Sequence, residues 1–223
     1  MAEQQILARS PIAPTGPTTV VAGWVVSALR STSPLTVVDQ TPLAKVVVRA
    51  DAVGRLADAL AVGAGHVSRP RVSGATGVVL VTSVAPGEWL VLAAPGEQRL
   101  VIDWLEALVP RSDAFVSVVD LTHGRALLRL TGPSAVDVLA KECAVDLSDR
   151  GFPDQRTLRT SVAGLAVDVV RDDQAGVPSY LLHCERSSGQ YLADVVLEAG
   201  AELGIDVDGF RPHGSHDKHD NRD

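Results

Sequence analysis

The sequence is poor in the residues that build metal sites, disulfide frameworks and nucleic-acid surfaces. Cys143 and Cys184 are its only cysteines, which argues against a zinc ribbon, an iron–sulfur cluster and a disulfide scaffold. Lysine and arginine number 20 against 27 aspartate and glutamate residues, a net charge of −7, and this balance argues against a dedicated nucleic-acid binder. Aromatic residues make up only 4%, too few for base-stacking platforms.

Long apolar runs are also scarce. The one near the start, Thr18–Leu29, is about half the length of a membrane-spanning helix and follows several prolines. Glu3 and a single early cation, Arg9, do not match the basic start of a signal peptide. We therefore expect a cytoplasmic protein without a membrane segment.

The remaining composition predicts a folded chain in four parts. Hydrophobic residues make up 46% of the 223 residues and charged residues 21%, enough apolar mass for a core. Prolines and threonines punctuate residues 1–42, which we expect to form an extended N-terminal arm. Residues 43–112 and 113–207 are predicted to form a first and a second βα unit. Residues 208–223 read as a flexible polar tail.

Internal repeats predict the fold class. The apolar stripe of the helix expected over Gln98–Leu108 recurs 91 residues later, from Tyr191 to Ala199. A shorter stripe, Leu56–Leu60, recurs as Ala135–Leu139. With the strands expected between them, each half runs strand, helix, strand, strand, helix. This order predicts an α+β fold of two pseudo-repeated ferredoxin-like (split βαβ) units, with antiparallel-rich sheets and helices packed on them.

Two further expectations concern the strands. The strand expected over Phe115–Leu121 either closes the first half or joins the two halves. Four apolar residues follow one another from Trp89 to Leu92, whereas a half-exposed strand would alternate more cleanly, so we expect both faces of the sheet to be covered.

No set of residues in the sequence predicts catalysis, cofactor binding or a metal site. The only GxG motif, Gly63–Gly65, follows a helix pattern instead of a strand, so it does not match a dinucleotide fingerprint. His213, His216 and His219 fit a solvated tail better than a metal site. His123, at a glycine turn, is the most site-like residue, although a local backbone contact explains it more simply.

Other charged and nucleophilic residues have ordinary explanations. His183 is expected to be a packed strand residue, and neither cysteine has a neighbour that would activate it. Arginines and aspartates alternate densely through residues 129–173, which predicts a salt-bridged surface. The arginines of this surface are Arg129, Arg150, Arg156, Arg159 and Arg171.

Three stretches resemble a known family. They are Pro86–Leu92 (PGEWLVL), Val119–Leu147 with its DLTHGRALLRLTGPSAVDVL core, and Glu185–Leu192 (ERSSGQYL). Together they resemble the γ subunit of heterotetrameric sarcosine oxidase, a family related in fold to the folate-binding half of the glycine-cleavage aminomethyltransferase. The resemblance is good over about residues 80–205. One departure stands out, because Ser188 and Gly189 replace an expected Phe-Ala pair.

The resemblance implies a non-catalytic structural subunit of an enzyme that oxidises sarcosine to glycine. Oxygen becomes hydrogen peroxide, and the methyl group leaves as formaldehyde or, with tetrahydrofolate, as methylenetetrahydrofolate. The partners implied are α, β and δ subunits. FAD and FMN would belong to the β subunit and its interface, NAD and tetrahydrofolate to α, and zinc to δ, with no cofactor in the γ chain.

Four residues are predicted to lie in the subunit interface: Trp24, Trp89, His123 and Arg186. Aromatic side chains concentrate binding energy at interfaces, although Trp89 could equally be a core residue. Two other functions stay open: a stand-alone aminomethyltransferase-like protein that binds tetrahydrofolate, and a ferredoxin-like binding module unrelated to sarcosine. The sequence does not identify the N-methylated amine, the stoichiometry, the contacting surfaces or any metal binding by the tail.

Overall fold

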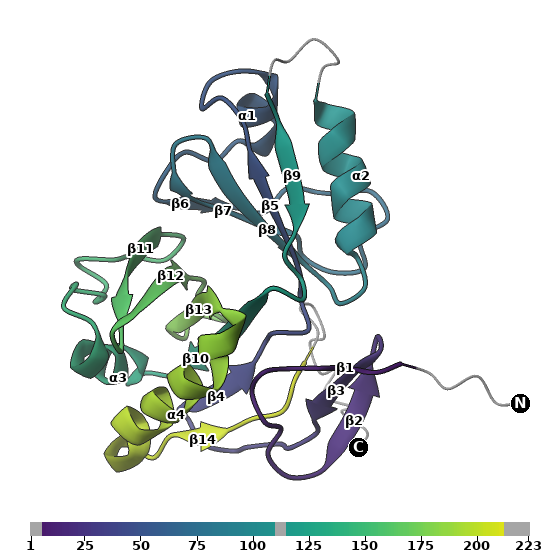
Figure 1. Ribbon diagram of the computed structural model, residues 1–223. Helices are drawn as coiled ribbons and strands as arrows, with labels where there is room; N and C mark the ends of the chain where they lie inside the picture. Colours follow the sequence, from purple (N-terminus) through teal and green to yellow (C-terminus); the bar gives the residue numbers. More distant parts are fainter. Residues whose placement is uncertain (1–5, 110–114, 212–223) are drawn as a thin grey trace, which may run out of the picture.

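The computed structural model describes residues 6–109 and 115–211, which form three β-sheets and four α-helices (Figure 1). Two large sheets carry the helices, and a small sheet near the N-terminus lies beside the second of them. The prediction of an α+β fold with antiparallel-rich sheets is confirmed. None of the helices in the described ranges is long and apolar enough to cross a bilayer.

The first large sheet has five strands in the order β6-β7-β8-β5-β9, and every neighbouring pair is antiparallel. Helix α2 (Gln98–Leu108) packs on one face of it, where Val101 and Leu105 join strand residues and the short α1 (Arg55–Leu60) in one core. The strands are β5 (Ala44–Arg49), β6 (His66–Ser68), β7 (Leu80–Ala85), β8 (Glu88–Ala93) and β9 (Ser117–Asp120).

The second large sheet has six strands in the order β11-β12-β13-β10-β4-β14. Helices α3 (Ala135–Glu142) and α4 (Gly189–Gly200) pack against it and share its core. Within this sheet, β14 and β4 are parallel, and the other neighbouring strands are antiparallel. The strands are β4 (Thr36–Asp39), β10 (Arg125–Thr131), β11 (Thr157–Val162), β12 (Leu165–Arg171), β13 (Ser179–Glu185) and β14 (Asp206–Val207).

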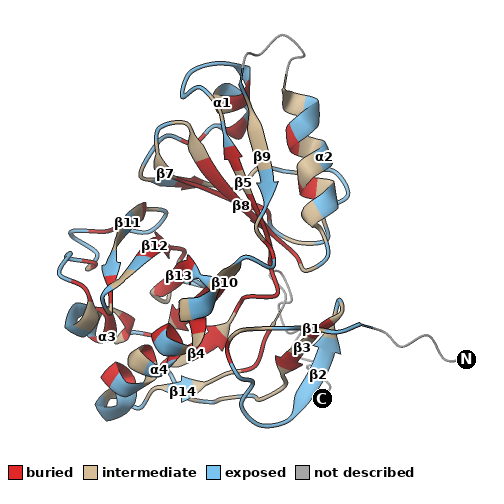
Figure 2. Ribbon diagram, viewed as in Figure 1, coloured by how far each residue is buried: buried red, intermediate tan, exposed pale blue. Residues whose placement is uncertain are grey.

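The predicted covering of both strand faces is confirmed on β8. Trp89 and Val91 face the core beneath α2, whereas Leu90 and Leu92 belong to a third core that also contains Leu127 of β10. This third core joins the two large sheets, and the buried residues run through both of them (Figure 2). Successive side chains of a strand point to opposite faces, so a continuous apolar run requires cover on both.

Strand β9 settles one open question and moves one predicted boundary. It pairs with β5, so the strand expected over Phe115–Leu121 closes the first sheet. The sequence analysis had assigned it to the second unit, residues 113–207. The boundary itself, between 112 and 113, falls in residues 110–114, outside the described part of the chain.

The predicted extended arm, residues 1–42, is wrong in its described part. Strands β1 (Ala8–Arg9), β2 (Thr18–Val21) and β3 (Trp24–Ser27) form the small sheet. Ala22 and Gly23 have φ angles of 46° and 81°, which give the tight turn of a β2–β3 hairpin. Strand β4 then enters the second large sheet, so the segment is part of the core.

The predicted tail, residues 208–223, begins as ordered structure. The backbone N–H groups of Asp208, Gly209 and Phe210 donate to the carbonyls of Val37, Leu29 and Ser27. Phe210 is buried, because its ring fills the third core. The tail histidines His213, His216 and His219 lie outside the described residues.

Candidate functional site

A cavity of about 460 Å³ opens between the two large sheets. We call it the inter-sheet cavity. Its apolar wall comes mainly from the first sheet, with Val47, Leu90 and Val119, and its polar wall comes from the second sheet, with Asp168 and His183. Sheet packing therefore brings together groups that are far apart in sequence, such as Val47 and Asp168.

A chain of charged side chains crosses this cavity from one sheet to the other. The Arg159 guanidinium contacts Asp168 at 2.6 Å within the second sheet and Glu88 of the first sheet at 2.7 Å. Arg49 contacts the other Glu88 oxygen at 2.9 Å. Burial raises the pKa of Asp168, but hydrogen bonds from His183 and Arg159 outweigh it, so its pKa lies below the usual value. Asp168 is therefore ionised at neutral pH.

His183 is the buried end of this row of charged side chains. Its Nδ1 lies 3.2 Å from Asp168, and complete burial lowers its pKa despite that carboxylate. The neutral ring therefore donates from Nδ1 and carries its lone pair on Nε2. Nε2 is buried without a hydrogen-bond partner among the described residues. The buried ring therefore has one acceptor atom that no described residue satisfies, beside a cavity that His183 lines.

The neighbouring cysteine does not add a nucleophile. Burial raises the pKa of Cys184 to about 11, so its thiol stays protonated at neutral pH. His183 itself is the packed strand residue that the sequence predicted, because it is only 2% exposed. The histidine–aspartate pair can accept a hydrogen bond or a proton, but it has no nucleophile beside it in the described chain.

The dense arginine–aspartate region is only partly the predicted surface. Arg129, Arg171, Asp168 and Asp172 are buried, at 9% exposure or less. Arg129 donates to Asp172 at 2.7 Å, and Arg69, from the loop after β6, contacts the same carboxylate. Sequence proximity suggested solvent-exposed pairing, but the β12–β13 register carries these groups into the protein. They form a second ionic link between the sheets.

Three of the four predicted interface residues lie around one groove of about 580 Å³. His123, exposed at the β9–β10 turn, stacks on Trp24 with ring centroids 4.7 Å apart and planes 10° apart. Arg186 donates to the Arg9 carbonyl at 2.6 Å. Ile6, Ala8 and Arg9 form one wall, so we call it the N-terminal groove. The aromatic contact at the His123 turn could not be read from local sequence.

Both tryptophans require a correction as exposed anchors. Trp24 and Trp89 are 3% and 2% exposed within the chain, so neither offers a free indole to a partner. Trp89 is a residue of the first sheet's core, and its indole N–H donates to the Val62 carbonyl at 3.1 Å. Trp24 supports the groove from beneath through its stack on His123.

Lys45 is a buried charge that the sequence analysis missed. It is fully buried, and its Nζ donates to the carbonyls of Thr41 and Leu43 at 2.6 and 2.8 Å. Burial lowers its pKa to about 7. The sequence feature that could have indicated its burial is its place beside the apolar run Val46–Val48. Lys45 lies where the chain passes from β4 to β5, and so between the two sheets.

The departure at Ser188–Gly189 has a structural explanation. A Cβ on Gly189 would lie 2.6 Å from the Ala126 Cβ and 3.0 Å from the Pro11 Cγ. Glycine therefore permits residues 11–12 to pack close to the start of α4.

Among the described residues, no group of three histidine, cysteine, aspartate or glutamate side chains could hold a metal ion.

Comparison with known proteins extends the resemblance seen in the motifs. A γ subunit of sarcosine oxidase from Arthrobacter sp. is 34% identical over 115 residues, 51% of this chain and 55% of the relative. Human mitochondrial dimethylglycine dehydrogenase is 29% identical over 126 residues, 56% of this chain and 14% of the relative. The matches thus cover about half or less of these relatives.

A chain of the heterotetrameric sarcosine oxidase from Corynebacterium sp. U-96 has the same fold. The TM-score is 0.64 at 24% identity, covering 79% of this chain and 89% of that chain. The resemblance to sarcosine oxidase γ subunits is confirmed by these similarities. The family model of the GCVT N-terminal domain matches residues 73–215, well over half of the sequence. The chain therefore belongs to the GCVT N-terminal domain family.

Proposed function

We propose that the chain is a non-catalytic structural subunit, of the γ type, in a heterotetrameric flavin-dependent sarcosine oxidase. The observation that carries this proposal is the 34% identity to a γ subunit, together with a fold shared by a chain of such a heterotetramer. The lack of a nucleophile beside His183 in the described chain also favours a structural role. The complex would oxidise sarcosine to glycine and form hydrogen peroxide, with formaldehyde or methylenetetrahydrofolate as the one-carbon product.

The proposed partners are α, β and δ subunits in the cytoplasm. FAD, FMN, NAD, tetrahydrofolate and zinc would be bound by those subunits. This chain would then contribute shape and contact surface to the assembly, and its own buried charges would serve to hold its two sheets together.

The N-terminal groove is the surface that we propose for a partner subunit. Arg9, Arg186 and His123 line it, and no aspartate or glutamate occurs among the described residues that do so. In a chain of net charge −7, this local cationic character favours a partner that presents a carboxylate. The neighbouring Ile6 is 94% exposed and would supply apolar contact.

Affinity purification of the tagged full chain from native cells tests this assembly. We expect a yellow complex of four subunits that oxidises sarcosine. His123→Glu should reduce the recovered partner at least several-fold, since it places a like charge opposite the proposed carboxylate. Arg55→Glu, at an exposed position on α1, is the matched control and should change nothing. A chain that purifies alone and colourless would overturn the proposal.

The inter-sheet cavity supports one alternative, a stand-alone aminomethyltransferase-like protein that binds tetrahydrofolate. Its support is the buried Nε2 of His183, an acceptor that lacks a partner among the described residues. Calorimetric titration of the isolated chain with tetrahydrofolate separates the two functions. Saturable one-to-one binding that His183→Phe abolishes would favour the alternative, and no heat of binding would exclude it.

The two large sheets also support the proposed pseudo-repeat of ferredoxin-like units. In the first, the order β5, α1, β7, β8, α2, β9 gives the sheet order β7-β8-β5-β9. In the second, β10, α3, β12, β13, α4 and β14 follow the same sequence, with β4 inserted between β10 and β14. Each unit adds one edge strand, β6 or β11, to the split βαβ pattern.

A further inference from the structure

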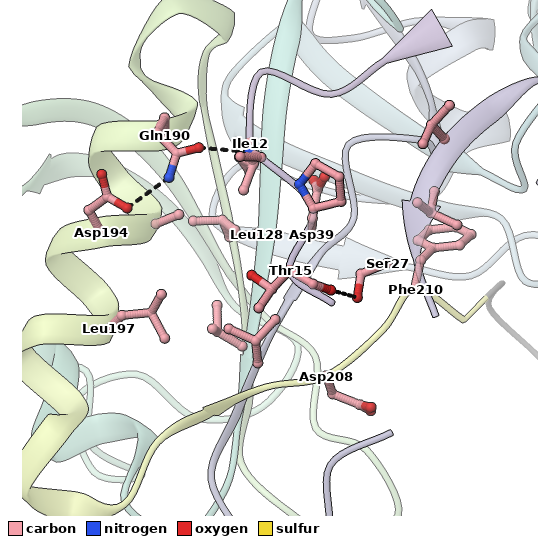
Figure 3. A pocket seen from close by; sticks show the side chains of 17 residues that line it. Ile12, Thr15, Ser27, Asp39, Leu128, Gln190, Asp194, Leu197, Asp208 and Phe210 are labelled. Atoms are coloured by element: carbon pink, nitrogen blue, oxygen red, sulfur yellow. Dashed lines mark hydrogen bonds between the residues drawn. The ribbon is translucent and has the colours of Figure 1, made fainter. Parts of the chain in front are cut away.

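A second cavity lies beside α4, on the face of the second sheet that α4 covers. It has a volume of about 360 Å³ and lies between the N-terminal segment, α4, β4 and the last described residues. Figure 3 shows Gln190, Asp194 and Leu197 entering from α4 on one side and Ser27 and Phe210 from the other. This volume is within the range of small-molecule sites. We call it the strap cavity.

Residues 12–15 form the strap that covers it. The Ala13 N–H donates to Gln190 Oε1 at 2.7 Å, and Ser27 Oγ donates to the Thr15 carbonyl at 2.7 Å. The Gln190 amide also donates to Asp194 at 2.7 Å. The first two contacts hold the strap, whose residues 13–15 are otherwise exposed, and the third lies within α4. The strap therefore has few contacts to break when a ligand enters.

The lining combines apolar walls with carboxylates. Val37, Leu128 and Phe210 are among the buried apolar residues, and Asp39, Asp194 and Asp208 are acidic. Arg211 contacts Asp208 at 3.2 Å from outside the lining. Lysine, arginine and histidine are all missing from the described residues that line this cavity. The cavity is therefore anionic, without a cation in its wall.

Asp39, at the end of β4, is a partly buried carboxylate that lines this cavity. Its Oδ1 accepts the Thr41 N–H at 2.9 Å. Burial raises the pKa of Asp39. The hydrogen bonds from Thr41 and Ser10 and the positive charge of Lys45 lower it, but by less. A carboxyl in such surroundings gains from a cation brought close to it, because low polarity strengthens charge pairing.

We propose that the strap cavity binds a small organic ammonium ion, in which a primary or secondary amine carries an aliphatic or aromatic body. The ammonium group contacts Asp39, and the body packs on Leu128, Val37 and Phe210. Asp194 at the mouth attracts the cation as it enters. This site does not depend on the proposed subunit role, since all its residues come from this chain.

Benzylammonium is a suitable probe, with benzyl alcohol as its uncharged analogue of the same shape. Titration of the full chain at neutral pH, followed by calorimetry and protein NMR, should show saturable binding of benzylammonium. Because a charged hydrogen bond contributes about 1.5–3 kcal/mol, we expect benzylammonium to bind at least about tenfold more tightly than benzyl alcohol. NMR shifts should centre on Leu128, Ala193 and Leu197.

Asp39→Asn tests the assigned contact. Asparagine still accepts the Thr41 N–H, so the fold should persist while the preference for the ammonium falls to about twofold or less. Asp58→Asn, exposed on α1, is the control and should retain the full preference. Should Asp39→Asn fail to fold, Leu197→Trp fills the cavity and should abolish binding instead. Equal binding of the two probes, no binding, or binding that survives Leu197→Trp would overturn the proposal.

Discussion

The two large sheets contain the same succession of elements but differ at one edge. In the first sheet β9 pairs directly with β5, whereas in the second β4 is inserted between β10 and β14. The inserted strand is well covered, with Val37 3% exposed, but Val119 on β9 is 44% exposed. The difference teaches that the N-terminal segment is a structural part of the second unit, since it supplies a core strand there.

The two ionic links between the sheets also differ in how far they are buried. On one side of the third core, Arg69 and Arg129 share the carboxylate of Asp172, whose side chain is 3% exposed. On the other, Arg159 contacts Glu88 with side-chain exposures of 49% and 18%. Water screens the second link, whereas Asp172 and Arg129 of the first are buried and Arg69 is 34% exposed. Only the buried link should therefore contribute much to stability.

Breaking the buried link should have the largest effect. Asp172→Asn leaves the positive charges of Arg69 and Arg129 without their shared carboxylate, at a cost of about 3–5 kcal/mol in the free energy of unfolding. Urea unfolding followed by circular dichroism measures it. Asp149→Asn is the matched control, because this partner of Arg171 is 86% exposed and should cost less than about 0.5 kcal/mol. A loss below about 1 kcal/mol for Asp172→Asn would contradict a buried link.

Lys45, buried between the two sheets, should make the stability of the folded chain depend on pH. Its pKa is about 7 in the folded chain and about 10.4 when unfolded, so the unfolded state binds more protons between these values. Stability should therefore rise with pH in this window, by about 1.4 kcal/mol per pH unit. Urea unfolding at pH 7 and pH 9 should show a gain of about 2 kcal/mol that Lys45→Met lacks, because the lysine of the folded chain is already half deprotonated at pH 7. Parallel pH profiles of the two proteins would exclude this assignment.

The inserted strand offers a more local comparison. Val37→Ala on β4 removes two buried methyl groups and should cost about 2 kcal/mol, including the cavity left behind. Val119→Ala on the exposed edge strand β9 should change stability by less than about 0.5 kcal/mol. Thermal unfolding of both variants measures the contrast. Equal losses would mean that β4 is no better covered than β9.

The exposed link should give the smallest effect. Glu88→Gln removes the carboxylate shared by Arg49 and Arg159 but leaves both guanidiniums in contact with water, so we expect a loss of about 0–1 kcal/mol. Because salt screens exposed charges, the loss should shrink further at high ionic strength. Unfolding in urea at low and high salt checks both points. A loss as large as that of Asp172→Asn would remove the distinction between the two links.

Much of the fold could be predicted from the sequence because it depends on the local spacing of apolar residues. The stripes in α2 and α4 recur at helical spacing, and the β8 run from Trp89 to Leu92 is apolar at every position. The sequence did not predict the β2–β3 hairpin or β4 because the prolines around them suggest extended chain, while hairpin pairing and sheet insertion depend on other segments. Of the site, the sequence predicted Trp24, Trp89, His123 and Arg186 as interface residues, and the structure brings all of them except Trp89 to one groove.

The sequence by itself determined the apolar stripes of α2 and α4, the apolar run of β8 and the resemblance to a known family. These follow from side-chain spacing and from motifs within single segments. Only the tertiary structure decided which charges are buried: Lys45, Arg129, Asp168 and Asp172 are all enclosed where the sheets meet. The physical reason is that burial and electrostatic environment depend on what packs against a residue, and those neighbours come from distant parts of the chain.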